Sequence, residues 1–103
     1  MEQYNWNDIP EEQVNPLMTR KVIQMPGVRV LQLQFKKGAV VPVHHHLDEQ
    51  ITMVSSGALR FESNGRAVIL HSGDVLRVPS DLPHSAEALD DSTSTEVFIA
   101  PTS

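Results

Sequence analysis

Three consecutive histidines, His44, His45 and His46, stand between two strand-like segments of this 103-residue chain. Side chains alternate faces along a β-strand, so His44 and His46 should point to one side and His45 to the other. Two imidazoles on one face, with the carbonyl-bearing Gln50 four residues further on, form half of a metal site. His84 supplies one more imidazole from a distant block, residues 73–84. The chain therefore has to fold so that these two blocks meet.

The rest of the chain predicts short β-strands separated by turns. Residues 29–35 alternate apolar and polar side chains with a period of two, which is typical of a strand with one buried face. Pro26-Gly27 and Asn64-Gly65 are turn signals, and Asn-Gly favours a tight hairpin. We therefore expect an all-β sandwich or barrel. Neither a linker nor a repeat divides the chain, so residues 1–103 should form one domain, with residues 1–18 as an N-terminal arm.

The two histidine blocks resemble the paired motifs of the cupin superfamily. The marks of the first motif fall on Gly38, His44, His46, Gln50 and Gly57, and those of the second on Gly73, Pro79 and His84. Asp81 replaces an inner glycine of the second motif, in a turn where Asp tolerates unusual backbone angles. The resemblance implies a cupin jelly-roll (double-stranded β-helix) barrel. It also implies one metal ion bound by His44, His46, Gln50 and His84.

Gln50 occupies the position where cupins usually carry a glutamate. Glu49 is the alternative ligand, but a strand would direct it to the opposite face. The same argument places His45 outside the site or in a supporting role, and His71 lies in a turn, where we expect it to be solvated. With no cysteine in the chain, imidazole and oxygen ligands suit a divalent first-row ion, and the sequence does not distinguish Mn, Fe, Co, Ni and Zn.

Among cupins, the chain is similar to small single-domain members that act on uronates. The similarity rests on residues 19–23, on Lys37-Gly38-Ala39 and on residues 73–77. It implies conversion of 4,5-unsaturated uronate monomers to the open-chain keto form, a lyase- or isomerase-type reaction. Such relatives carry an acidic residue, a Phe and an Arg near the C-terminus. Glu96 and Phe98 match the first two, so Glu96 is the candidate acid or base. Arg77 is either a solvent-facing residue or the candidate partner of a substrate carboxylate in the cavity.

Two other functions stay open at this stage. A metal-dependent dioxygenase would use a similar centre, although usually with a glutamate ligand. A non-catalytic cupin would bind a metal or a small molecule without turnover. In each case the metal would have open positions and the partner would be a small molecule, such as a carbonyl or hydroxy-acid compound.

Composition and charge argue against two classes of binding partner, nucleic acids and membranes. The formal charge is -5 and the longest basic runs are pairs of residues, which argues against nucleic acid. No apolar stretch has membrane length, and no signal peptide pattern opens the chain, so we expect no membrane partner and a cytoplasmic location. Tyr4, Trp6 and Ile9 lie on the arm without a core of their own. We therefore expect a homodimer in which the arm packs across the partner.

Overall fold

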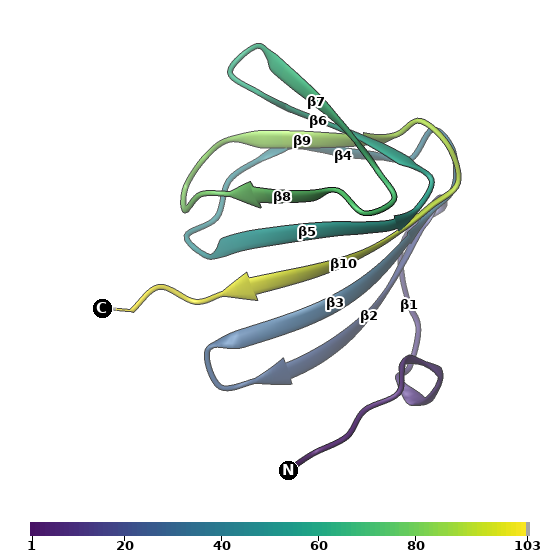
Figure 1. Cartoon of the computed structure of the whole chain (residues 1–103), viewed down its shortest axis with the longest axis vertical. Helices are drawn as coiled ribbons and strands as arrows, with labels where there is room; N and C mark the ends of the chain where they lie inside the picture. Colours follow the sequence, from purple (N-terminus) through teal and green to yellow (C-terminus); the bar gives the residue numbers. More distant parts are fainter. Residues whose placement is uncertain (103) are drawn as a thin grey trace.

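The computed structural model describes residues 1–102 and consists of two antiparallel β-sheets that face each other (Figure 1). The six-stranded sheet has the order β1-β2-β3-β10-β5-β8, and the four-stranded sheet has the order β4-β9-β6-β7. The strands of the first sheet are β1 (Glu12–Asn15), β2 (Met18–Met25), β3 (Val28–Phe35), β10 (Ser92–Ile99), β5 (Glu49–Ser56) and β8 (Val75–Val78). Those of the second are β4 (Val40–His44), β9 (His84–Ala88), β6 (Ala58–Ser63) and β7 (Arg66–His71). This is the predicted jelly-roll barrel.

The alternation of apolar residues determines which face of each strand is buried. Leu31, Leu33 and Phe35 of β3 are buried, as are Val54 of β5 and Leu59 of β6. Their side chains meet between the two sheets and exclude water from the barrel interior. Both sheets therefore contribute to one hydrophobic core, which makes the barrel a rigid support for polar residues at its end.

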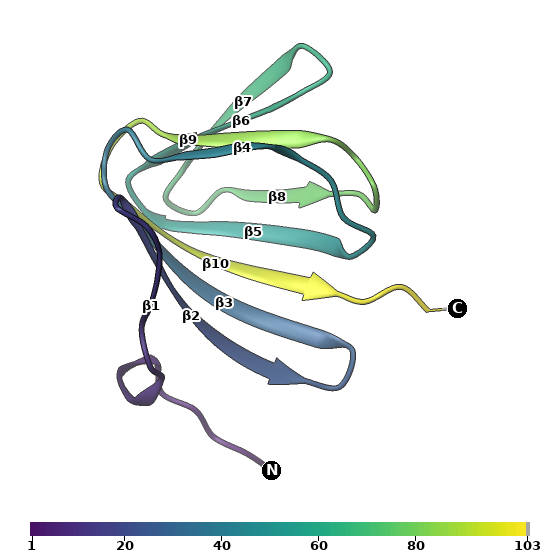
Figure 2. The ribbon, with the colours of Figure 1, turned by 180° about the vertical axis from the view of Figure 1, so that it is seen from behind.

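The two sheets lie close together at the right of Figure 1 and diverge toward the left, where the C-terminal segment leaves the barrel. Figure 2 shows the same divergence from behind. The β4–β5 and β8–β9 connections both lie at the diverging end. This end is the mouth of the barrel, and both histidine blocks reach it.

The turns follow the local sequence. Asn64 and Gly65 both have positive φ, of 51° and 78°, and join β6 to β7 in a two-residue hairpin, as the Asn-Gly signal predicts. Asp81 has a φ of 63°, so the residue that replaces the motif glycine does adopt the left-handed conformation.

The N-terminal arm is more structured than predicted. Trp6–Asp8 form a short 3-10 helix that Asn5 caps, and β1 pairs with β2 within the segment expected to be an extended arm. The Nζ of Lys21 also donates a hydrogen bond of 2.8 Å to the backbone oxygen of Trp6. β1 and β2 form a tight hairpin in which Asn15 is opposite Met18, and the mostly polar sequence of β1 has no alternation of apolar residues that would have indicated a strand. Within residues 1–102 the structure has no helix with the length and apolar character of a membrane span.

Candidate metal centre

The imidazoles of His44, His46 and His84 converge at the barrel mouth. His44 and His84 stand opposite each other on the paired strands β4 and β9, with ring centroids 4.3 Å apart. The His46 ring lies 5.6 Å from that of His44 and 5.2 Å from that of His84. One ring nitrogen from each residue lies within 4.8 Å of the others. Three imidazoles at this spacing can hold one metal ion.

The sequence predicts His46 on a strand, whereas the structure places it in a loop. β4 ends at His44, so His46 lies in the β4–β5 connection and not on the strand. Strand alternation therefore does not orient it. Its Nδ1 contacts the backbone oxygen of Asp48 at 3.0 Å, which holds the ring toward the other two histidines.

All three imidazoles are oriented in the same way, through Nδ1. The Nδ1 atoms of His44 and His84 contact the backbone oxygens of Pro42 and Leu82, at 2.9 and 2.8 Å. A carbonyl oxygen can only accept a hydrogen bond, so each Nδ1 carries the proton and each Nε2 has a free lone pair. Histidines that bind metals are held in this way by a second hydrogen bond.

The Nε2 of His84 is the clearest sign that a cation belongs here. His84 is buried, and its Nε2 has no hydrogen-bond partner among the described residues. A buried polar atom without a partner is costly and rare. Burial lowers the pKa of His84, and the neighbouring His44 and His46 lower it further, so the ring is held in the neutral form that binds metal.

Gln50, the fourth candidate ligand, lies beside His46. Its side chain is buried on β5, and its Oε1 lies 3.0 Å from the Nε2 of His46. The amide nitrogen donates to the Thr52 hydroxyl at 2.9 Å and to a Glu96 oxygen at 3.3 Å, which turns the oxygen toward the histidines. With Nδ1 of His46 protonated, two acceptors face each other, and a cation between them would satisfy both.

The neighbouring carboxylate, Glu49, lies on the other face of β5. Its oxygens accept hydrogen bonds from the Arg77 guanidinium and from the Ser80 backbone N–H. The hydrogen bond from Arg77 lowers the pKa of Glu49. Of the two candidate oxygen ligands, the structure thus places Gln50 beside the histidines.

Glu96 lies inside the barrel, next to the candidate centre. It occupies the middle of β10, is 5% exposed and is opposite Thr52 of β5. Burial raises the pKa of its carboxyl to about 7. This carboxyl shares a cavity of about 210 Å³ with His44, His84 and Gln50. Apolar side chains line most of the remaining wall, among them Leu31, Leu33, Phe35, Val41, Phe61 and Phe98.

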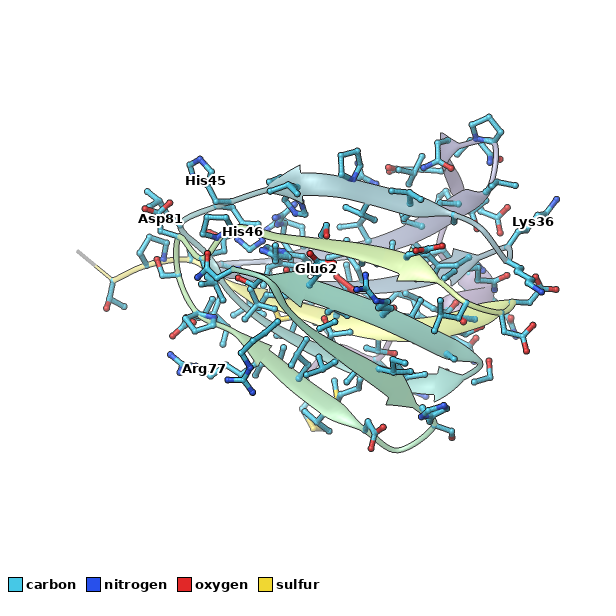
Figure 3. The ribbon with its side chains drawn as sticks, turned by 90° about the horizontal axis from the view of Figure 1, so that it is seen from above. Lys36, His45, His46, Glu62, Arg77 and Asp81 are labelled. Carbon is cyan, nitrogen blue, oxygen red and sulfur yellow. The ribbon has the colours of Figure 1, made fainter. Side chains whose placement is uncertain are left out.

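Arg77 lies apart from this cavity. Its guanidinium is largely exposed and forms an ion pair with Glu49, and Figure 3 shows it well separated from His46. It lines a neighbouring depression of about 320 Å³ that includes His84 but neither Gln50 nor Glu96. The structure thus brings five of the six predicted site residues together and leaves Arg77 outside.

The two predicted non-ligand histidines lie elsewhere. His45 is exposed, and its Nδ1 contacts the Asp81 carboxylate at 2.8 Å (Figure 3). The backbone N–H of Asp81 also donates a hydrogen bond of 2.7 Å to the backbone oxygen of His46. These two contacts of Asp81 connect the β4–β5 loop to the β8–β9 loop. His71 is exposed at the end of β7.

Two features of the site were not predicted from the sequence, namely the roles of Arg29 and Arg20. The ring of Phe98, which the resemblance had singled out, packs edge-on against His46 with centroids 5.3 Å apart, and the Arg29 guanidinium covers the same Phe98 ring at 5.0 Å. Arg20 lines the cavity that contains the candidate ligands. Alternation along residues 18–22 places Arg20 on the same strand face as the buried Met18, and this pattern could have indicated from the sequence that Arg20 faces the cavity.

The fold and the site together define a class: small two-sheet β-barrels with three histidines at the mouth. The sequence profile of the Cupin domain family matches residues 31–100, well over half of the chain, and the chain belongs to the cupin family. A comparison with curated protein sequences gives no significant match.

Solved structures agree with this assignment. The structure of KdgF from Halomonas sp. superposes with a TM-score of 0.90 and 28% sequence identity, over 99% of this chain and 96% of that one. An RmlC-like cupin from Shewanella frigidimarina gives 0.88 and 21%, over 98% and 93%. A predicted oxalate decarboxylase from Thermotoga maritima gives 0.86 and 20%, over 97% and 100%.

Proposed function

We propose that this cupin is a metal-dependent enzyme that acts on a small carbonyl or hydroxy-acid substrate, and that linearisation of a 4,5-unsaturated uronate is its reaction. The observation that carries the proposal is the position of Glu96. Its carboxyl lies in the same cavity as His44, Gln50 and His84 and accepts a hydrogen bond from Gln50. A site built only to hold an ion would not need an acid beside it.

His44, His46, His84 and Gln50 would hold the metal, which would act as a Lewis acid toward a substrate oxygen. Four protein ligands leave coordination positions open for the substrate, as catalytic sites do. The cavity is smaller than the roughly 300–1,000 Å³ that holds drug-sized ligands. The substrate should therefore be a single small molecule.

Glu96 would move the proton. In the proposed isomerisation the anomeric hydroxyl loses a proton, the bond from that carbon to the ring oxygen breaks, and carbon 4 gains a proton as the keto group forms. One carboxyl can accept the first proton and deliver it to carbon 4, so the step needs no oxidant or reductant. The apolar wall around Glu96 would keep water from exchanging that proton.

The test uses purified protein loaded with a single divalent metal and a 4,5-unsaturated uronate monomer. We expect loss of the absorbance of the double bond, with formation of the open-chain keto acid. Glu96→Gln should retain the metal and lose at least 100-fold in turnover, within the range that general acid-base groups contribute. Unchanged turnover in this variant would remove Glu96 from the mechanism.

The same preparation separates the alternatives. Oxygen uptake with a diketone and no uronate turnover would favour a dioxygenase. A bound metal with neither activity would favour a non-catalytic binding protein. The amide of Gln50, in place of a carboxylate, leaves a bound ion with a higher net charge, which favours Lewis-acid chemistry over both.

A further inference from the structure

The cavity that contains the candidate ligands has one permanent positive charge in its wall. Arg20 is the only lysine or arginine among the described residues that line it. It stands on β2 opposite the buried Leu33 of β3, so its side chain is on the inner face of the six-stranded sheet. The Arg20 side chain is 42% exposed, so its guanidinium keeps part of its hydration while it lines a cavity that also contains a carboxyl and two imidazoles.

Only one nitrogen of the Arg20 guanidinium donates a hydrogen bond to another described residue. Its Nε donates to the Glu12 carboxylate at 3.0 Å, across the β1–β2 pair. Its two terminal nitrogens have no hydrogen-bond or ion-pair partner among the described residues. Arginine presents paired donors that match a carboxylate. Glu12 therefore fixes one edge of Arg20 and leaves donors available to a ligand.

Strand geometry gives the distance between Arg20 and the acid of the site. Glu96 pairs with Leu31, Leu31 pairs with Val22, and Arg20 lies two residues before Val22 on β2. Two strand spacings and one two-residue step place the Arg20 and Glu96 Cα atoms about 12 Å apart. The two side chains extend into the space between, which leaves room for a compact organic acid.

We propose that Arg20 binds the carboxylate of the substrate, and that Glu12 of the N-terminal arm positions it. The inference rests on the proposed function and assigns to it a specificity-determining residue. The Glu12 carboxylate already offsets the charge of Arg20. The terminal nitrogens that remain present a planar pair of donors, which matches the two oxygens of one carboxylate, so the ligand class is a monocarboxylate.

Direct binding to the zinc-loaded protein tests the proposal without turnover. The probes are galacturonate, which lacks the 4,5 double bond, and galactose, its neutral counterpart, each measured by calorimetry. We expect Arg20→Gln to weaken galacturonate binding about tenfold or more, as loss of a charge-assisted pair does. Zinc stoichiometry and galactose binding should not change. The matched variant Arg77→Gln should bind galacturonate like the wild type.

Glu12→Gln guards against a folding artefact, because it perturbs the same corner and keeps the guanidinium. We expect this variant to bind galacturonate at least as tightly as the wild type, because the Gln amide oxygen can still accept the Arg20 Nε hydrogen bond that positions the guanidinium, while the competing negative charge is removed. Equal galacturonate affinity in Arg20→Gln and wild type, or equal losses in Arg20→Gln and Glu12→Gln, would overturn the role of Arg20.

Failure of the proposed function can be distinguished from failure of the Arg20 proposal. If wild type turns over the unsaturated uronate and Arg20→Gln leaves galacturonate affinity unchanged, the enzyme stands and the anchor is wrong. If galacturonate binds through Arg20 but no turnover occurs, the anchor stands and the catalytic proposal is wrong. If zinc-loaded wild type does not bind galacturonate, both fail.

Discussion

At the scale of single residues, the candidate centre depends on polar atoms whose hydrogen bonds are arranged in advance. Each imidazole donates through Nδ1 to a backbone oxygen, and the Gln50 amide is fixed by Thr52 and Glu96. Because these side chains are already oriented, binding of an ion would cost less side-chain conformational entropy. The individual side chains therefore lend themselves to direct tests.

The first prediction concerns metal content. His84→Ala and His44→Ala should each lower the bound divalent metal to well below one ion per chain, because each removes one of three converging imidazoles. His71→Ala, an exposed histidine outside the cluster, is the control and should keep the metal. Elemental analysis after dialysis against trace metal gives the stoichiometry. Stoichiometry near that of wild type in both His44 and His84 variants would show that the ion binds elsewhere.

The second prediction concerns Glu96 in metal-free protein. Its pKa is about 7 in the folded state against an ordinary 4.5, so unfolding releases a proton between these values. The free energy of unfolding of wild type should therefore fall as pH rises from 4.5 to 7 and then level off. Glu96→Gln lacks this charge and should be more stable than wild type at pH 8, by on the order of 2 kcal/mol.

Urea unfolding in the presence of a chelator, at pH 5 and pH 8, measures this difference. The stability gain of Glu96→Gln should be small at pH 5 and reach its full size at pH 8. The same gain at both pH values would mean that burial of the charge is not its cause.

At the scale of elements, tight connections between strands set the register that brings the two histidine blocks together. β5 passes into β6 through Gly57, which has a φ of 86°. A Cβ at this position would lie 2.2 Å from the backbone oxygen of Asp91 and from the Ser92 hydroxyl oxygen. Ser92 in turn joins β10 to Ala58 at the start of β6 by hydrogen bonds. The glycine therefore permits a close approach as well as a turn.

The third prediction uses this contact. Gly57→Ala should destabilise the protein by about 3 kcal/mol or more, since the strain of positive φ is joined by an overlap with backbone atoms. Gly73→Ala is the matched control, because Gly73 has a φ of 90° but open space around its Cβ position. That variant should lose only about 1–2 kcal/mol. Denaturant unfolding of both compares them, and equal losses would show that the close approach does not matter.

At the scale of the whole molecule, the outer face of the six-stranded sheet carries a row of partly exposed apolar residues. Ile23, Val30, Val97 and Ile51 pair side by side across β2, β3, β10 and β5. All four are partly exposed and point away from the barrel core. The N-terminal 3-10 helix is joined to the same sheet through Lys21 and Trp6. An apolar row beside an arm is typical of a surface that a partner covers.

The fourth prediction is the homodimer expected from the sequence. Light scattering at micromolar concentration should give twice the mass of one chain. Deletion of residues 1–11, which leaves β1 intact, should weaken the dimer, and Ile51→Lys should weaken it further by placing a charge in the apolar row. A mass of one chain for wild type, unchanged in both variants, would rule the dimer out.

The sequence by itself determined the fold class and the candidate ligands, because both are encoded by local patterns. Alternation marks the strands, turn residues mark their ends, and the spacings around His44 and His84 mark the two blocks that meet. Strand parity was enough to prefer Gln50 over Glu49, and the resemblance to uronate-acting cupins was enough to single out Glu96. These patterns belong to short segments of sequence and do not depend on where the segments lie in the fold.

Tertiary structure decided the rest. Arg77 was the arginine named from the sequence for a substrate carboxylate, but the pairing of β5 with β8 places it beside Glu49, outside the cavity. Arg20 lines the cavity because β1 and β2 pair and Glu12 holds it there. His46 is oriented by loop hydrogen bonds and by Phe98 from the far end of the chain. Contacts between residues distant in sequence are fixed by sheet order and register, which no local pattern specifies.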